Sequence, residues 1–180
     1  MPASRVAVIR CDTYDTPAVE SAVTRGLELL GGARQFVRPG ERVVLKPNLL
    51  VPSGADKAVT THPAVFSAVA RALAGAGAEL SWGDSPGFGT TVGAGRKAGI
   101  VQAAEELGIP VADFEHGRVA SFPAGELIKQ FTIAEGVAAA DGLVSLPKLK
   151  THALTRMTGA VKNRYIARDI DRTKQPLYAA

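Results

Sequence analysis

The sequence is poor in cysteine and in aromatic residues. Cys11 is the single cysteine in 180 residues, so the chain cannot form an internal disulfide. It also cannot supply the four thiolates of a cysteine-ligated zinc or iron–sulfur site. Aromatic residues make up 6% of the chain, which disfavours a surface that stacks the bases of single-stranded nucleic acid. Disulfide scaffolds and cysteine-ligated metal proteins are therefore excluded as functional classes for this chain alone.

Long hydrophobic runs and long charged runs are also missing. No apolar stretch is long enough to cross a membrane, and the N-terminus turns polar too early for a signal peptide. We therefore expect a cytoplasmic protein that does not associate with membranes. The net charge of +4 comes from 21 basic and 17 acidic residues. This small excess suits an anionic small molecule and gives no strong case for nucleic acid. Nothing in the sequence predicts an oligomeric state.

What the sequence does contain is an alternation of short apolar runs and amphipathic stretches. Hydrophobic residues make up 46% and charged residues 21% of the chain, as in ordinary globular domains. Helices are predicted from Pro17 to a stop at Gly31, from a cap at Thr61 through Leu73, over 96–107 and over 134–140. Strands are predicted over 5–10, 42–45, 78–82, 109–114 and 142–146, with a pair of short strands between 117 and 135.

This order predicts an α/β fold with a mostly parallel, Rossmann-like three-layer sheet that has helices on both faces. In such folds, ligands bind where loops leave the carboxyl ends of the strands. Three polar segments follow predicted strands, namely 46–48, 83–87 and 147–152. We therefore expect these three segments to meet at one edge of the sheet.

The first polar segment contains Lys46 and Asn48. Pro47 keeps Lys46 out of a helix and stiffens the loop, and the amide of Asn48 can both donate and accept hydrogen bonds. The functional interpretation is that Lys46 and Asn48 contact an anionic ligand. The simpler alternative is a solvated lysine at the end of a strand, because exposed lysines are common.

The second segment is the glycine-rich loop "GDSPGFG", which contains Asp84 and Ser85. It lacks the Gly-Lys-Ser/Thr ending of a Walker A loop. Its backbone N–H groups and Ser85 can hold a phosphate, and Asp84 can act as a base. The alternative is an ordinary turn with a capping aspartate or serine.

Two further stretches carry histidine. His62 lies in "TTHP" at a helix start, where backbone N–H groups favour an anion; the alternative is a surface residue at the helix start. In "LPKLKTH", an extended chain would place Lys148, Lys150 and His152 on one face, because side chains alternate along a strand. We interpret that face as an anion-binding surface, and the alternative is an edge strand protected by lysines.

Lys162 and Asn163 in "TGAVKN" repeat the pairing of lysine with asparagine. If the lysines and histidines converge, they form an anion-binding site, since lysine suits phosphate and carboxylate. No metal is expected there, because lysines repel cations and Asp84 is the one acidic residue in the set. In an enzyme, His62 or His152 would transfer a proton, and Asp84 would orient one of them or bind a hydroxyl.

Taken together, the motifs "VVLKPNLLVP", "TTHPAV", "GDSPGFG", "LPKLKTH" and "TGAVKN" resemble the DUF362 domain family over residues 43–163. The pairing of the last two motifs is the specific part of this resemblance. Members of the family often carry an additional ferredoxin-like segment that binds 4Fe–4S clusters, and they are commonly labelled as oxidoreductase-associated. The resemblance thus implies an iron–sulfur-linked oxidoreductase system with a ferredoxin-like electron-transfer partner. No cofactor is expected in this chain, which lacks the cysteine-rich segment.

The expected function is the binding of an anionic small molecule at a strand-end site lined by lysine and histidine. The sequence does not decide whether the chain is an enzyme. The alternative is a non-catalytic binding module for a phosphorylated cofactor or an acidic partner. We assign residues 1–163 to the DUF362-like domain and 164–180 to an atypical charged tail. Because the family pattern fails after Asn163, we expect a truncated or frame-altered form of a longer domain, with a sheet that is incomplete at its C-terminal end.

Overall fold

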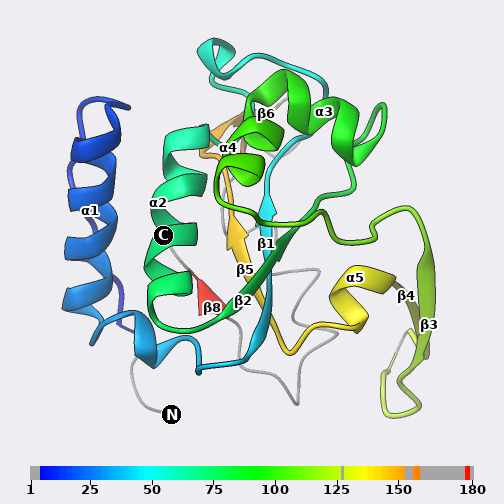
Figure 1. Cartoon of the computed structure of the whole chain (residues 1–180). Coiled ribbons are helices and arrows are strands. Elements are labelled where there is room, and N and C mark those ends of the chain that lie inside the picture. Colours follow the sequence, from blue (N-terminus) through cyan, green and yellow to red (C-terminus); the bar gives the residue numbers. More distant parts are fainter. Residues whose placement is uncertain (1–4, 127, 153–155, 159–176, 179–180) are drawn as a thin grey trace.

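The fold is a mixed α/β arrangement built on a parallel sheet (Figure 1). The computed structural model describes residues 5–126, 128–152, 156–158 and 177–178, with side chains over 5–126 and 128–151. Within those residues the strand order is β2-β1-β5-β8, and every neighbouring pair is parallel. The strands are β1 (Arg42–Pro47), β2 (Glu79–Trp82), β5 (Gly142–Leu146) and the short β8 (Leu177–Tyr178).

Helices cover one face of this sheet. Helix α2 (Pro63–Gly75) packs on β1 and β2, and α1 (Thr16–Leu29) and α4 (Ile100–Glu106) pack against α2. Helix α3 (Thr91–Ala98) precedes α4, and a short α5 (Glu135–Ala138) precedes β5. Two 3₁₀ turns lie at Ala33–Gln35 and Ala55–Lys57. The predicted helices at 17–30 and 134–140 are confirmed.

The core forms between α2 and the sheet. Val43 and Leu45 of β1 are fully buried in one cluster with Phe66 and Leu73 of α2. Phe66 also meets the indole ring of Trp82 edge-on, with the ring centroids 6.3 Å apart. Each large apolar side chain buried in this way contributes about 1.5–3 kcal/mol. The alternation of side chains along β1 then places Val44 and Lys46 on the opposite face of the sheet.

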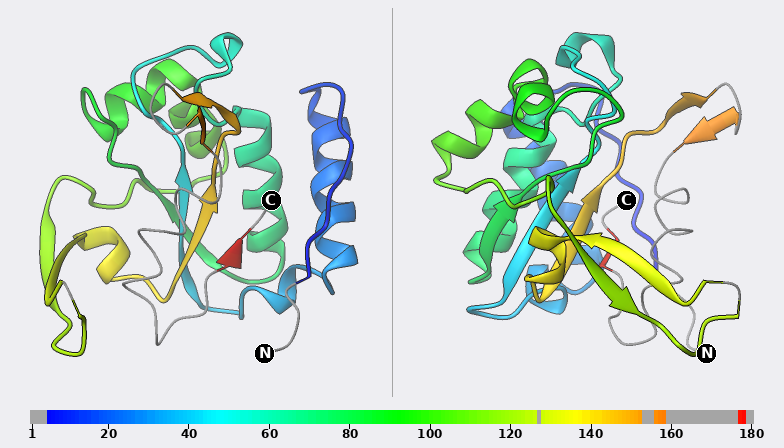
Figure 2. Two further views of the ribbon diagram at one scale, coloured as in Figure 1. Left: turned by 180° about the vertical axis from the view of Figure 1, so that it is seen from behind. Right: turned by 90° about the vertical axis from the view of Figure 1, so that its right-hand side faces the viewer.

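Two small antiparallel pairs lie outside this sheet. The predicted pair of short strands is confirmed as β3 (Gly117–Ser121) and β4 (Gln130–Ala134). Figure 2 shows this hairpin on the far side of the sheet from α1. A second pair joins β6 (Lys150–His152) to β7 (Arg156–Thr158). The expected division of the chain after residue 163 lies outside the described residues.

Two predicted strands are wrong. Residues 5–10 are extended but do not pair with any described strand, although Ala7 and Ile9 alternate with the exposed Val6 and Val8 as in a strand. Residues 109–114 form only a single bridge, between Val111 and Trp82. Proline 110 contributes to that failure, because it has no N–H to donate to a ladder.

In place of the single helix predicted over 96–107, the chain forms α3 and α4, and this helical region begins at Thr91. The side chain of Thr90 caps α3 by accepting a hydrogen bond from the backbone of Gly93 at 3.1 Å. Gly99 then ends α3 and precedes α4 with a φ of 79°, a left-handed conformation that glycine adopts without strain. The helical periodicity continued across this break, so the sequence pattern alone did not reveal it.

The predicted cap of α2 is also corrected. His62, not Thr61, is the N-cap residue, and its Nδ1 accepts a hydrogen bond from the backbone N–H of Ala64 at 3.2 Å. Pro63 fits the first helical position, where no N–H is needed. Among the described residues, no helix has the length and apolar character that crossing a membrane requires.

Candidate functional site

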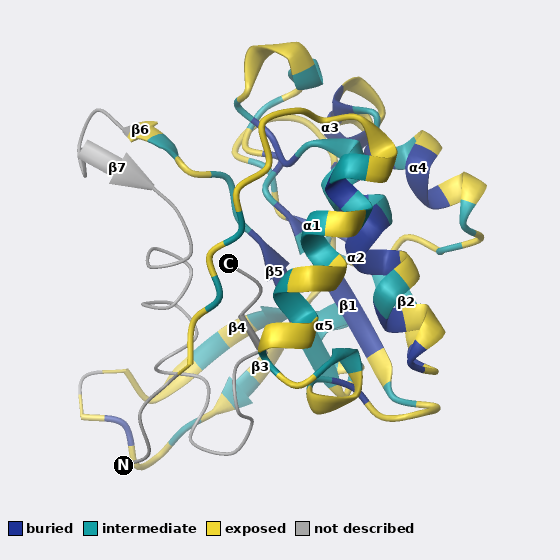
Figure 3. Cartoon of the chain, turned by 90° about the vertical axis from the view of Figure 1, so that its left-hand side faces the viewer, coloured by how far each residue is buried: buried dark blue, intermediate teal, exposed yellow. Residues whose placement is uncertain are grey.

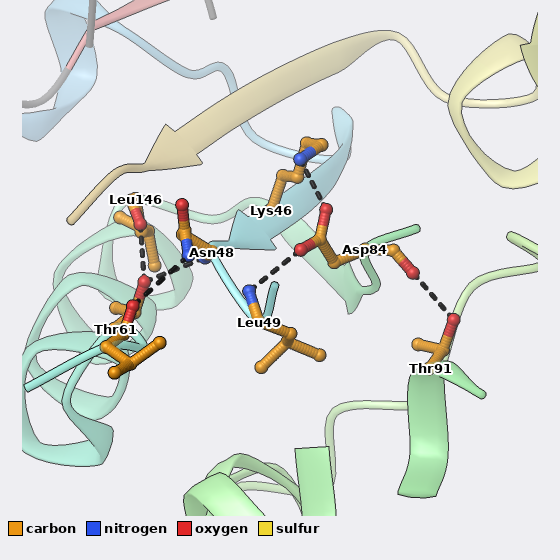
Figure 4. A network of polar contacts seen from close by, with 8 residues as sticks. Lys46, Asn48, Leu49, Thr61, Asp84, Thr91 and Leu146 are labelled. Carbon is orange, nitrogen blue, oxygen red and sulfur yellow. Dashed lines mark hydrogen bonds and ion pairs between the residues drawn. The ribbon is translucent and has the colours of Figure 1, made fainter. Parts of the chain in front are cut away.

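The carboxyl ends of β1, β2 and β5 meet at one edge of the sheet, as the sequence predicts, because the three strands are parallel. Strand β1, the loops that leave these strands and the starts of α2 and α3 supply polar residues at this edge, and Figure 4 shows those around Asp84 and Thr61. They form two clusters with different character. One is an ion-paired network around Asp84, and the other is a stack of Tyr14, His62 and Lys148.

Asp84 is the centre of the first cluster. One carboxylate oxygen pairs with Nζ of Lys46, and the other accepts a hydrogen bond from the backbone N–H of Leu49 at 2.8 Å. The hydroxyl of Thr91 donates to the carbonyl oxygen of Asp84 at 2.6 Å. The side chain of Asp84 is 7% exposed and that of Lys46 is 30% exposed. Both carboxylate oxygens are therefore occupied within the protein, which suits a structural role that fixes the ends of β1 and β2.

Gly83 allows the chain to pass close to a neighbouring loop at this point. A Cβ at Gly83 would lie 2.2 Å from the ring of Phe114, which is far inside van der Waals contact. A glycine is therefore required before Asp84, because any side chain there would collide with Phe114. Ser85, which the sequence places in a phosphate-binding role, is exposed in the same loop.

Thr61 ties the ends of β1 and β5 to the start of α2. Its hydroxyl donates to the carbonyl oxygen of Leu146 at 2.5 Å and accepts from the backbone N–H of Asn48 at 2.8 Å. The backbone N–H of Thr61 also donates to the carbonyl oxygen of Asn48 at 3.1 Å. Thr61 is 3% exposed, so these bonds lie in a buried joint between three elements.

The carbonyl oxygen of Val59 accepts from two predicted ligand-binding residues. Nζ of Lys150 donates to it at 2.9 Å, and Nδ2 of Asn48 donates to it over a long 3.5 Å. Both side chains therefore help to hold the loop before α2 in place.

Tyr14 is the centre of the second cluster. Its ring stacks on the imidazole of His62 with centroids 3.9 Å apart and planes 13° from parallel. Nζ of Lys148 donates to the Tyr14 hydroxyl at 2.9 Å and lies 5.4 Å from the ring centroid. Tyr14 is 48% exposed, so this cluster is open to solvent on one side.

The charges of this cluster are unbalanced. Within the part of the chain that the structure describes, Lys148 makes no ion pair with a carboxylate. Burial, together with the positive charge of Lys148, lowers the pKa of His62 below its ordinary value of 6.5. His62 is therefore neutral at pH 7, with Nδ1 occupied by the helix cap and Nε2 left to donate.

The two clusters lie on opposite faces of the sheet. Because side chains alternate along a strand and Val43 and Leu45 of β1 pack on α2, Lys46 lies on the opposite face of the sheet. His62 begins α2, and Lys148 reaches it through Tyr14. The structure thus brings His62 and Lys148 together but separates both from Lys46. Lys162, Asn163 and the side chain of His152 lie outside the described residues.

Tyr14 was not found by sequence reasoning. It precedes the predicted helix at 17–30 and belongs to no polar motif that follows a strand, so only the folding of the N-terminal segment against α2 reveals it. As for metals, no three His, Cys, Asp or Glu side chains come together as ligands within 5–126 and 128–151.

Comparison with known proteins identifies relatives of this chain. Residues 43–167 match the model of the family described as "Domain of unknown function (DUF362)". Over 160 residues, the chain is 36% identical to the Thylakoid-associated protein sll1697 of Synechocystis sp.. That alignment covers 89% of this chain and 49% of the cyanobacterial protein, so the chain spans about half the length of this curated relative. No solved structure matches the chain significantly.

Proposed function

Since the chain belongs to the DUF362 family of domains of unknown function, its activity must be argued from its own site, and we propose that it binds an anionic small molecule at the cluster of Tyr14, His62 and Lys148. The observation that carries this proposal is the lack of a carboxylate partner for Lys148 among the described residues. Lys148 is partly exposed, and an ammonium whose hydrogen-bond partner is a neutral phenol favours an anion nearby.

The three side chains offer complementary donors. Lys148 supplies a positive charge, the hydroxyl of Tyr14 can donate its proton while it accepts from Lys148, and neutral His62 can donate from Nε2. A carboxylate or a phosphate accepts bonds of this kind, and bonds between charged partners are about twice as strong as neutral ones. The net charge of +4 adds a weak general attraction for anions.

Proton transfer and redox chemistry are further parts of this proposal. Neutral His62 carries its proton on Nε2, so it can accept a proton only at Nδ1, which would have to give up the helix cap to Ala64. If the domain works in an iron–sulfur-linked oxidoreductase system, the electrons would come from a ferredoxin-like cluster outside these 180 residues, because one cysteine cannot hold such a cluster.

The same proposal extends to the architecture. We infer that the parallel sheet belongs to a Rossmann-like three-layer fold with helices on both faces. The support is that Val44 and Ser145 are buried on the face of the sheet opposite α2.

Calorimetric titration with inorganic phosphate and with acetate tests the binding site. Lys148→Met should weaken binding at least about tenfold, since hydrogen bonds to a charged group contribute about 1.5–3 kcal/mol. Lys57→Met is the matched control, because it also removes one lysine charge but from an exposed pair with Asp56. The control should bind within about twofold of wild type. Equal affinity of the Lys148→Met variant and wild type for both anions would overturn the assignment.

A further inference from the structure

An apolar cavity adjoins the proposed anion site. It has a volume of about 330 Å³ and lies between α1, α2, β5 and the extended N-terminal segment (residues 5–14). Its walls include Ile9, Val23, Leu27, Val69 and Val144. Figure 3 shows the N-terminal segment running alongside α1. The cavity is therefore lined mainly by apolar side chains from four separate segments and is open to solvent on one side.

The N-terminal segment presents its alternate side chains to this cavity. Ala7 and Ile9 line the cavity, as do Cys11 and Thr13 further along, while Val8 is 88% exposed on the other side. Helix α1 packs against α2, and the cavity fills the space between α1 and β5. The predicted strand at 5–10 thus acts as a wall of the cavity and not as part of the sheet.

Tyr14 joins the cavity to the cationic cluster. Tyr14 lines the cavity, and its hydroxyl accepts a hydrogen bond from Lys148. Pro147, which also lines the cavity, is the residue directly before Lys148. One end of an apolar space therefore meets an ammonium group that lacks a carboxylate partner among the described residues.

We propose that the ligand is an anionic amphiphile, whose apolar chain occupies this cavity and whose carboxylate or phosphate head binds at Lys148. This inference rests on the proposed function, because it assigns the head group to the same anion site. The volume is at the small end of the range of about 300–1,000 Å³ that ligand pockets occupy. It corresponds to about eleven times the ~30 Å³ that one water molecule takes up. A single medium-length chain fits this volume.

The lining also argues against a highly polar ligand. Among the residues that line the cavity, Cys11, Thr13 and Tyr14 are the ones with polar side-chain atoms. A sugar or a nucleoside placed there would lose hydrogen bonds to water without replacing them, and that loss is costly in an apolar site. An alkyl chain loses nothing of this kind and is driven into the cavity by the hydrophobic effect.

A homologous series of carboxylates tests the inference by calorimetry, from acetate through hexanoate and octanoate to decanoate. Each added methylene should tighten binding by about fourfold until the cavity is full, since a buried methylene contributes about 0.8 kcal/mol and 1.36 kcal/mol is a factor of ten. Lys148→Met should weaken the binding of every member of the series by a similar factor.

A variant that fills the cavity provides the second readout. Ala22 lines the cavity from α1, whereas Ser21 is exposed on the same helix. Ala22→Leu should weaken decanoate binding by about tenfold or more and leave acetate binding unchanged. Ser21→Leu adds the same side chain to the surface and should change neither affinity.

The outcomes separate this inference from the proposed function. If acetate binds in a manner that depends on Lys148 but longer chains bind no more tightly, the amphiphile is wrong and the anion site stands. If decanoate binds equally well to wild type and Lys148→Met, the head-group assignment is wrong, and both proposals fail. If thermal unfolding shows the protein to be folded, failure of every carboxylate to bind would refute the amphiphile. Failure of inorganic phosphate to bind as well would refute the proposed function.

Discussion

Replacement of Lys46 by methionine separates a structural lysine from a ligand-binding one. Lys46→Met would leave the carboxylate of Asp84, which is 7% exposed, with only the Leu49 N–H as a partner. Loss of one partner from a fully buried pair costs about 3–5 kcal/mol, and exposed pairs contribute about 0–1 kcal/mol. Because Lys46 is 30% exposed, we expect a loss of about 2–3 kcal/mol in the free energy of unfolding.

Urea denaturation measures this loss directly, and thermal unfolding gives an independent check. For a chain of this size, 1 kcal/mol lowers Tm by about 2–4 °C, so the predicted decrease is about 4–12 °C. Lys57→Met is the control, because the side chains of Lys57 and Asp56 are 70% and 71% exposed. That variant should lose less than about 0.5 kcal/mol.

A double-mutant cycle sharpens the test. Asp84→Asn retains an oxygen that can accept from Leu49, and in combination with Lys46→Met it removes both charges. The double variant should lose less stability than the sum of the two single losses, because the two residues are in contact. If Lys46→Met unfolds with wild-type stability but no longer binds phosphate, the structural role of Lys46 is wrong and it belongs to the ligand site.

Three further predictions follow from other parts of the fold. Thr61→Val should lower the free energy of unfolding by about 2 kcal/mol, because it removes the hydroxyl that bonds the partly buried N–H of Asn48 and the carbonyl of Leu146. Thr60→Val removes a buried hydroxyl that has no partner among the described residues and should be neutral or stabilising by urea denaturation. A larger loss in Thr60→Val than in Thr61→Val would contradict the network. Gly99→Ala should cost about 1–2 kcal/mol in the same assay, because φ is 79° there; a stabilised variant would show that this break between α3 and α4 is misplaced. The lowered pKa of His62 means that the unfolded state binds a proton more readily than the folded state. The contribution of His62 to the free energy of unfolding should therefore be fully present above pH 6.5 and should decrease as the pH falls below 6.5. This pH dependence should be weaker in His62→Asn, which keeps a capping oxygen, and an unchanged pH dependence would assign it to other groups.

Strongly periodic segments of the chain were predictable from sequence. The apolar run at 42–45 and the run at 142–146 are neighbouring parallel strands, and most of their side chains are buried. The segment at 5–10 has the same β-branched composition, but no described strand lies beside it to pair with. Strand propensity reports on residues that fit a sheet surface, and it cannot show whether a neighbour is present.

The site was predictable only at the level of the sheet edge. The rule that ligands bind at the carboxyl ends of parallel strands predicts that Lys46, Asp84 and Lys148 lie at one edge of the sheet. The parallel pairing of β1 with β2 and β5 confirms this placement. Which residues meet at that edge depends on side-chain alternation and on tertiary contacts. Lys46 turned to one face and pairs with Asp84, and Lys148 meets Tyr14 from a segment 134 residues away. Sequence spacing carries no information about such a contact.

The pKa of His62 in the presence and absence of ligand tests the central claim most directly. Its imidazole signal can be followed by NMR as the pH is varied, first for the free protein and then with saturating inorganic phosphate or octanoate. The free protein should show a pKa below 6.5, and a bound anion beside Lys148 should raise that pKa, because a negative charge favours the imidazolium form. A ligand that saturates the protein while the pKa of His62 stays unchanged would contradict binding at this cluster.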